Sequence, residues 1–231
     1  MFDIEKYLGI DIDQLTNKQM SSPKNEEIPV HIDENGEVKE RSNLMIVKSR
    51  CPILITSSEI DGKIITIYHA YINGPIEDME GYVPLIDLLN RANENMVFYI
   101  HIQSGGGMVT TGATVASAIA NCKGHVITIA EGLCASAASL IWSAGHEWEV
   151  GDYAMFMYHM SSHADMNNSL YIKENAEKMV NYVKRCLMHN ALKNGHITSD
   201  ECVKFCENKD EVWISAEEMR NRLKEQKLIK G

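Results

Sequence analysis

Residues that could carry out covalent chemistry occur at four places in the chain, and each place borders a short apolar run. A glycine triplet occupies residues 105–107, Ser136 lies among small residues, and His159 follows a strand-like run. Two adjacent acids, Asp210 and Glu211, precede another strand-like run. A serine, a histidine and an acid from separate strand ends can converge into the triad that activates a serine oxygen for attack on a carbonyl. Acyl transfer is therefore the first hypothesis.

The glycine triplet, Gly105, Gly106 and Gly107, allows the backbone to approach a ligand closely and to turn its N–H groups outward. The residues alone leave two interpretations open. One is an oxyanion hole or a phosphate cradle, and the other is a tight turn between a strand and a helix. No lysine follows the triplet, so it is not a P-loop.

Ser136 is expected at the start of a short helix, residues 136–144, which follows the expected strand 125–129. The free N–H groups and the dipole of a helix stabilise negative charge at that position. The alternative is a small-residue packing helix in which Ser136 is only an N-cap, and the G-x-S-x-G elbow of α/β-hydrolases is absent. His159 is one of nine histidines, and it is a candidate catalytic residue only in combination with Ser136.

Four further residues have side chains that bind zinc: Cys186, His189, Cys202 and Cys206. Their spacing is imperfect for a zinc site. Three of them are cysteines on the apolar sides of expected helices, and buried cysteine that binds nothing is common. We therefore expect neither a metal nor a cofactor.

From residue 65 onward, strand-like and helix-like patterns alternate, which predicts an α/β fold with a mostly parallel sheet. In such sheets ligands bind beyond the carboxyl ends of the strands, where the glycine triplet, Ser136 and His159 all fall. The longest helical pattern covers residues 168–194, and it is expected to protrude. The expected strands are 65–72, 97–102, 125–129, 153–158 and 212–214, and the other expected helices are 82–92, 109–120, 136–144 and two that begin after Thr198 and Ser215.

The length and composition are those of an ordinary globular protein: 231 residues, of which 45% are hydrophobic and 23% charged. The formal net charge of −10 argues against nucleic acid or an anionic membrane as the main partner. No apolar run is long enough to cross a bilayer, and the N-terminus does not look like a secretory signal. The scattered cysteines fit a reducing, cytoplasmic location.

Five segments, in this order and spacing, resemble the Clp protease proteolytic-subunit family, the ClpP-like serine peptidases related to crotonase-fold proteins. The resemblance runs from about residue 65 to residue 229 and implies a ClpP/crotonase-like spiral of strand-turn-helix units. It sets residues 61–231 apart as a peptidase domain from a divergent N-terminal arm with short strands, residues 1–60. The segments are 71–76 (YINGPI), 102–109 (IQSGGGMV), 132–139 (GLCASAAS) with 143–145, 155–159 (MFMYH) and 213–218 (WISAEE).

The resemblance implies site roles residue by residue. Ser136 corresponds to the nucleophile and His159 to the general base, and the backbone N–H groups of Gly107 and Ala137 correspond to the oxyanion hole. The family's acid position falls on Glu211, where the family usually has Asp, and the adjacent Asp210 remains an alternative. The loop residues Gly105, Gly106 and Met108 are implied to bind substrate, with Gly105 in place of the family's usual proline.

The resemblance also implies partners: an extended or unfolded polypeptide as substrate, a homo-oligomeric ring that can stack into a double ring, and an ATP-dependent unfoldase. The helix 168–194 is expected to supply contacts between facing rings. Three alternatives remain open: a phage-type capsid-maturation protease, a catalytically inactive ring subunit, and a crotonase-like acyl-CoA enzyme.

Overall fold

The computed structural model describes residues 45–47, 50–60, 63–160, 178, 181–182, 184–186, 189–208 and 210–229. The chain divides into two units, Met1–Arg41 and Ser42–Gly231, and every described residue belongs to the second unit. In this described part, no helix is both long enough and apolar enough to span a membrane.

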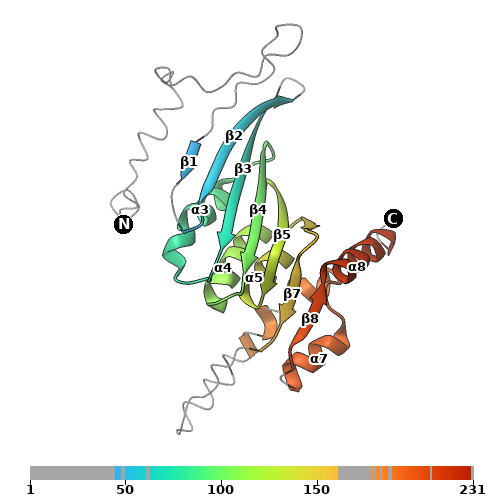
Figure 1. The fold of residues 1–231 in the computed structure, drawn as a ribbon. Coiled ribbons are helices and arrows are strands. Elements are labelled where there is room, and N and C mark those ends of the chain that lie inside the picture. The colour runs from blue at the N-terminus through green and yellow to red at the C-terminus, as the bar shows by residue number, and fades with distance from the viewer. Residues whose placement is uncertain are drawn as a thin grey trace. The chain divides into compact units, whose positions relative to one another are not determined.

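A single mixed sheet organises the second unit, and its strands follow the order β1-β2-β3-β4-β5-β7-β8, with β6 also paired to β5 (Figure 1). The central pairings β3–β4, β4–β5, β5–β6 and β5–β7 are parallel, whereas β1–β2, β2–β3 and β7–β8 are antiparallel. The strands are β1 Met45–Val47, β2 Ile53–Ile60, β3 Lys63–Asn73, β4 Met96–Ser104, β5 His125–Ala135, β6 Glu147–Val150, β7 Met155–Tyr158 and β8 Val212–Ser215. The predicted α/β class with a parallel centre is confirmed.

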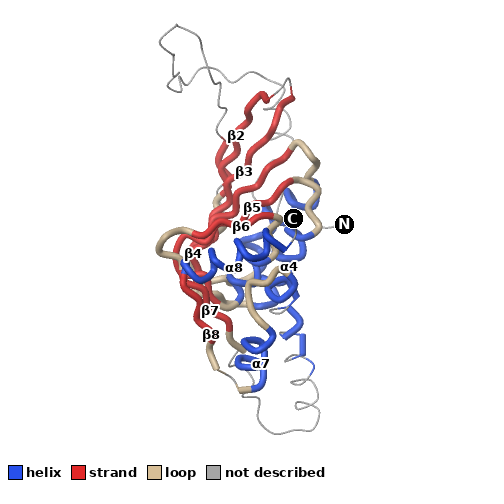
Figure 2. Tube along the Cα trace, turned by 90° about the vertical axis from the view of Figure 1, so that its right-hand side faces the viewer, coloured by secondary structure: helices blue, strands red, loops and turns tan. Residues whose placement is uncertain are grey.

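The helices give the sheet one covered face, and Figure 2 shows α4 to one side of the strand layer. Side chains alternate along β4, so that Phe98, Ile100 and Ile102 are fully buried in the core while the residues between them face the other way. The helices α4 and α5 approach closely because Gly112 lies against Ala137. The helical elements are the 3-10 helix η1 Met79–Tyr82, α3 Val83–Arg91, α4 Val109–Ala120, α5 Ala137–Ser143, α7 Ser199–Glu207 and α8 Ala216–Ile229.

Most predicted elements occur close to their expected bounds, and α4 begins and ends where the pattern predicted. One prediction about a strand is wrong, and one strand was not predicted. The third core strand, β5, was expected to end at residue 129, but it continues to Ala135 because its second half pairs with β7. The strand β6 was not predicted, since its four residues alternate glutamate with Trp148 and Val150 and carry too weak a pattern.

The last two helices begin where they were predicted, directly after Thr198 and Ser215. Thr198 and Glu201 form a complete capping box at the start of α7, and the Ser215 hydroxyl accepts a hydrogen bond from the Glu218 N–H at the start of α8. Most of the predicted helix 168–194 lies outside the described residues. Its described members at 178, 181–182, 184–186 and 189–193 are helical.

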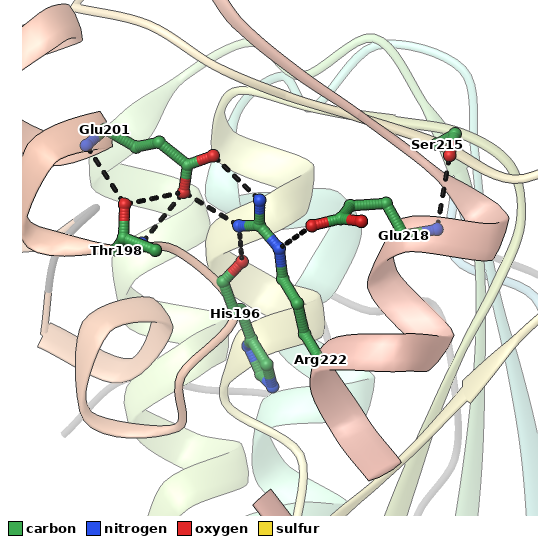
Figure 3. Close-up of polar contacts among 6 residues, drawn as sticks. All are labelled: His196, Thr198, Glu201, Ser215, Glu218 and Arg222. Atoms are coloured by element: carbon green, nitrogen blue, oxygen red, sulfur yellow. Dashed lines mark hydrogen bonds and ion pairs between the residues drawn. The ribbon is translucent and has the colours of Figure 1, made fainter. Parts of the chain in front are cut away.

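A largely buried ion pair joins the last two helices (Figure 3). The Arg222 guanidinium donates two hydrogen bonds to the Glu201 carboxylate, at 2.7 and 2.8 Å, and one to the His196 carbonyl at 2.8 Å. The Arg222 and Glu201 side chains are only 15% and 16% exposed. Burial alone would raise the pKa of the Glu201 carboxyl, but hydrogen bonds and charge from Arg222, with hydrogen bonds from Thr198, outweigh it and hold that pKa below its ordinary value.

We predict that Arg222→Ala lowers the free energy of unfolding by about 3 kcal/mol near pH 7, because it leaves the Glu201 carboxylate largely buried without its cation. Since the folded-state pKa of Glu201 is depressed, this contribution is complete above the carboxyl's ordinary pKa of 4.5 and disappears as the pH falls through the lower folded value. Urea unfolding followed by tryptophan fluorescence measures both effects.

The matched control is Arg91→Ala, which removes an exposed Arg91–Asp87 pair one helical turn apart. It should cost under about 1 kcal/mol. Equal losses for the two variants would mean that the burial of the Arg222 pair does not matter. A loss for Arg222→Ala that stays the same as the pH falls below 4.5 would contradict the assigned role of Glu201.

Candidate active site

Ser136 lies at the junction between β5 and α5 in a backbone conformation that L-residues rarely adopt. Its φ is 55° and its ψ is −120°, and it is the only residue other than glycine with a positive φ in the described part of the chain. Its N–H donates to the Met157 carbonyl at 2.8 Å, and its own carbonyl accepts the Ser139 hydroxyl at 2.7 Å. A strained strand-to-helix turn of this kind presents a serine oxygen at a strand end.

The Ser136 hydroxyl is not used to build the helix. Although Ser136 occupies the N-cap position, its side chain makes no capping hydrogen bond, and α5 begins one residue later than predicted, at Ala137. This geometry does not support the interpretation of Ser136 as a simple N-cap.

Neighbouring groups that could compete as nucleophiles are disabled by burial. Cys134 is fully buried, and burial raises the pKa of its thiol well above the ordinary value, so it stays protonated. Ser139 is also fully buried, and its hydroxyl is committed to the Ser136 carbonyl. Ser136 is also nearly buried, with 8% of its surface exposed, but no hydrogen bond engages its hydroxyl among the described residues.

The glycine loop packs directly against the Ser136 turn. A Cβ added to Gly106, whose φ is +93°, would lie 2.6 Å from the Ala135 carbonyl oxygen and 2.7 Å from the Ser136 Cβ. At Gly107, whose φ is +148°, an added Cβ would lie 2.1 Å from the Ile76 carbonyl oxygen. No other residue type fits these two positions without moving the backbone.

Two backbone N–H groups remain available beside Ser136. Ile76 forms a parallel bridge with Gly107: its N–H donates to the Gly106 carbonyl, and its carbonyl accepts the Met108 N–H. Within the described residues, neither the Gly107 N–H nor the Ala137 N–H donates a hydrogen bond. Free backbone donors flanking a serine are what an oxyanion hole requires.

The other predicted loop residues, Gly105 and Met108, flank this pair. An added Cβ at Gly105 would meet only the Leu133 side chain, at 3.8 Å, so Gly105 is not required by packing. Met108 precedes α4 and is 46% exposed, which leaves its side chain available to a bound chain.

His159 follows the last residue of β7 and is partly buried. The hydrogen bond from the Ser136 N–H to Met157 places Ser136 beside the end of β7, two residues before His159. The structure therefore brings the predicted serine and histidine to neighbouring strand ends. No hydrogen bond joins the Ser136 hydroxyl to His159 among the described residues.

The two candidate acids differ in position. The last ladder pair between β7 and β8 is Tyr158 with Val212, and continuing this register by one residue would place Glu211 opposite His159. The Asp210 N–H is bound to the Lys204 carbonyl near the end of α7, and Asp210 is exposed. Because side chains alternate faces along a strand, register places Glu211 on the side of His159.

Sequence reasoning missed Trp213, whose indole N–H donates to the Glu211 carboxylate at 2.9 Å. The available signal was the spacing of two along a strand, which puts Glu211 and Trp213 on the same face.

Other candidate sites gain no support. Within the described residues, no group of three or more His, Cys, Asp or Glu side chains is arranged to hold a metal, and the possible zinc ligand Cys202 is buried. A shallow cavity of about 350 Å³ lies between α3 and α4, beside Tyr182, and it includes no residue of the predicted site.

A model of the Clp protease family matches residues 57–221, well over half of the chain. The chain therefore belongs to the Clp protease family. Membership implies a peptidase, which is a hydrolase of peptide bonds, and the α/β sheet with interleaved helices is consistent with the family fold.

We predict that Gly106→Ala lowers the free energy of unfolding by at least about 2 kcal/mol, because a side chain at positive φ costs about 1–2 kcal/mol and the Cβ also collides with the backbone of the Ser136 turn. The neighbouring Gly105→Ala is the matched control and should change stability by less than about 0.5 kcal/mol. Urea unfolding of both variants decides, and equal small effects would show that the loop does not pack against Ser136.

Proposed function

We propose that this protein is a serine endopeptidase that cleaves extended polypeptides, with Ser136 as the nucleophile and His159 as the general base. The observation that carries the proposal is the strained Ser136 turn with two free N–H groups beside it, from Gly107 and Ala137. Family membership supports peptidase chemistry in general.

The proposed reaction is acyl transfer in two stages. The Ser136 oxygen attacks the peptide carbonyl carbon while His159 accepts the serine proton. The Gly107 and Ala137 N–H groups hold the oxyanion, and each such donor is typically worth about 3–4 kcal/mol. Collapse breaks the C–N bond, and His159 returns the proton to the leaving amine. Water, deprotonated by His159, then hydrolyses the acyl-enzyme and regenerates Ser136.

The substrate is proposed to bind as an extended strand along the loop at Gly105, Gly106 and Met108. The Ile76–Gly107 bridge shows that this loop already pairs like a strand. Recognition through main-chain hydrogen bonds would tolerate many side-chain sequences. A crotonase-like acyl-CoA enzyme would also use two N–H donors, but it would not require a reactive Ser136.

Ser136→Ala should reduce peptide turnover by about 10⁴-fold or more and should leave the free energy of unfolding within about 0.5 kcal/mol of the wild type. A fluorophosphonate probe should label the wild type at Ser136, as located by peptide mass spectrometry, and should not label the variant. Ser117→Ala, an exposed serine of α4, is the control and should behave like wild type. Turnover that survives Ser136→Ala would exclude this mechanism.

The proposed assembly is an oligomeric ring, and it is based on membership of the Clp protease family. A broadly tolerant peptidase in the cytoplasm needs enclosure, and a ring, alone or stacked on a second ring, supplies it. An ATP-dependent unfoldase is the proposed partner that would feed such a chamber. Tyr182, a helical residue with 41% of its surface exposed, is a candidate contact between subunits.

Native mass spectrometry should show a closed multimer of the 26.0 kDa subunit. Tyr182→Glu should weaken the assembly, because it places a charge in an apolar contact. Tyr153→Glu is the matched control, since Tyr153 is 92% exposed on a turn. A monomeric wild type would exclude the ring. An intact assembly of the Tyr182→Glu variant would show that Tyr182 is not part of the contact between subunits.

A further inference from the structure

The outer face of β7 and β8 carries a row of side chains that leads to the proposed triad. Met157 and Trp213 are register partners on this face, and Met157 is nearly buried there, with 9% of its surface exposed. Continuing the same register would place His159 and Glu211 at the next positions. The opposite face of both strands is core, where Tyr158, Val212 and Ile214 are buried. Trp213 is therefore not a core residue, and 52% of its surface is exposed.

Among the described residues, the Trp213 indole makes one polar contact, and it is with the carboxylate of Glu211. Its Nε1–H donates to Glu211 Oε2 at 2.9 Å. In the described part of the chain, no donor is bound to the other oxygen, Oε1. The two oxygens of the carboxylate thus have different surroundings, and Oε1 is the one available to accept a hydrogen bond from the His159 ring.

The hydrogen bond from Trp213 is important because the Glu211 side chain is long and flexible. A glutamate has one more rotatable bond than an aspartate, and fixing a long side chain costs conformational entropy. Glu211 is exposed, so packing does not fix it. A hydrogen bond from a neighbour on the same face of the strand restricts the carboxylate to orientations in which one oxygen is held beside Trp213.

We infer that Trp213 is a positioning residue for the proposed reaction: its indole N–H holds Glu211 so that the other carboxylate oxygen orients His159. This inference rests on the proposed serine peptidase function. Trp213 acts only through Glu211, and it touches neither the substrate nor Ser136.

The test is a double-mutant cycle on steady-state peptide hydrolysis. Trp213→Phe retains an aromatic ring and removes the N–H, so it should lower kcat about 5- to 10-fold, with KM changed less than about twofold. Glu211→Gln should lower kcat by about 100-fold or more, because an amide cannot stabilise the imidazolium. Adding Trp213→Phe to Glu211→Gln should then change kcat by less than about twofold.

Controls separate this role from a structural one. Met155→Ala alters a 38% exposed apolar side chain on the same face and should leave kcat and KM unchanged. Trp213→Leu also lacks the N–H, so it should lower kcat as Trp213→Phe does, and it replaces Trp213→Phe in the cycle if that variant folds poorly. Urea unfolding checks that stability is retained in each case.

The outcomes distinguish this inference from the proposed function. Wild-type kinetics for Trp213→Phe, an effect on KM alone, or the same loss of kcat with and without Glu211 would each overturn the role of Trp213. If Trp213 fails this test but Ser136→Ala still abolishes turnover in the same assay, the proposed peptidase function stands. If Ser136→Ala remains active, the proposed function itself fails, whatever the Trp213 variants show.

Discussion

The close packing of Gly106 against the Ser136 turn is the contact on which the candidate site depends. Ser136 has a φ of 55°, and a side chain in such a conformation costs roughly 1–3 kcal/mol that its surroundings must offset. The hydrogen bond from its N–H to Met157 and the buried helix α5 provide this support. Because only glycine fits at Gly106, the loop and the turn fix one another and leave the Gly107 and Ala137 N–H groups beside the serine.

The direction of the strands explains where each site residue occurs in the chain. The strands β4, β5 and β7 run parallel, so the residues that follow them, including Ser136 and His159, meet at one edge of the sheet. The strand β8 runs antiparallel to β7, so its beginning, and not its end, lies at that edge. This is why the candidate acid Glu211 precedes its strand whereas the other site residues follow theirs.

The ion pair between Arg222 and Glu201 lies in the C-terminal helices, away from the candidate site. The helices α7 and α8 border β8 in the chain, and the Arg222–Glu201 contact joins them through a bidentate pair that excludes most solvent. A buried pair of this kind is weak support for net stability, but it is costly to break on one side. It connects the two helices that flank the segment carrying Glu211 and Trp213 in the chain.

Local pattern was sufficient for much of this protein. The helical spacing in α4, the capping box of Thr198 and Glu201, and the placement of Ser136 and His159 at strand ends were all predictable, because each depends on residues near one another in sequence. The extension of β5 to Ala135, the strand β6, the positive φ of Ser136 and the contact between Trp213 and Glu211 were not predicted. The first three depend on pairing and packing between distant segments. The register of β8 against β7, which ends at the pair of Tyr158 with Val212, favours Glu211 over Asp210 as the residue nearer to His159, because a shift of one residue would reverse the faces of every side chain in the strand.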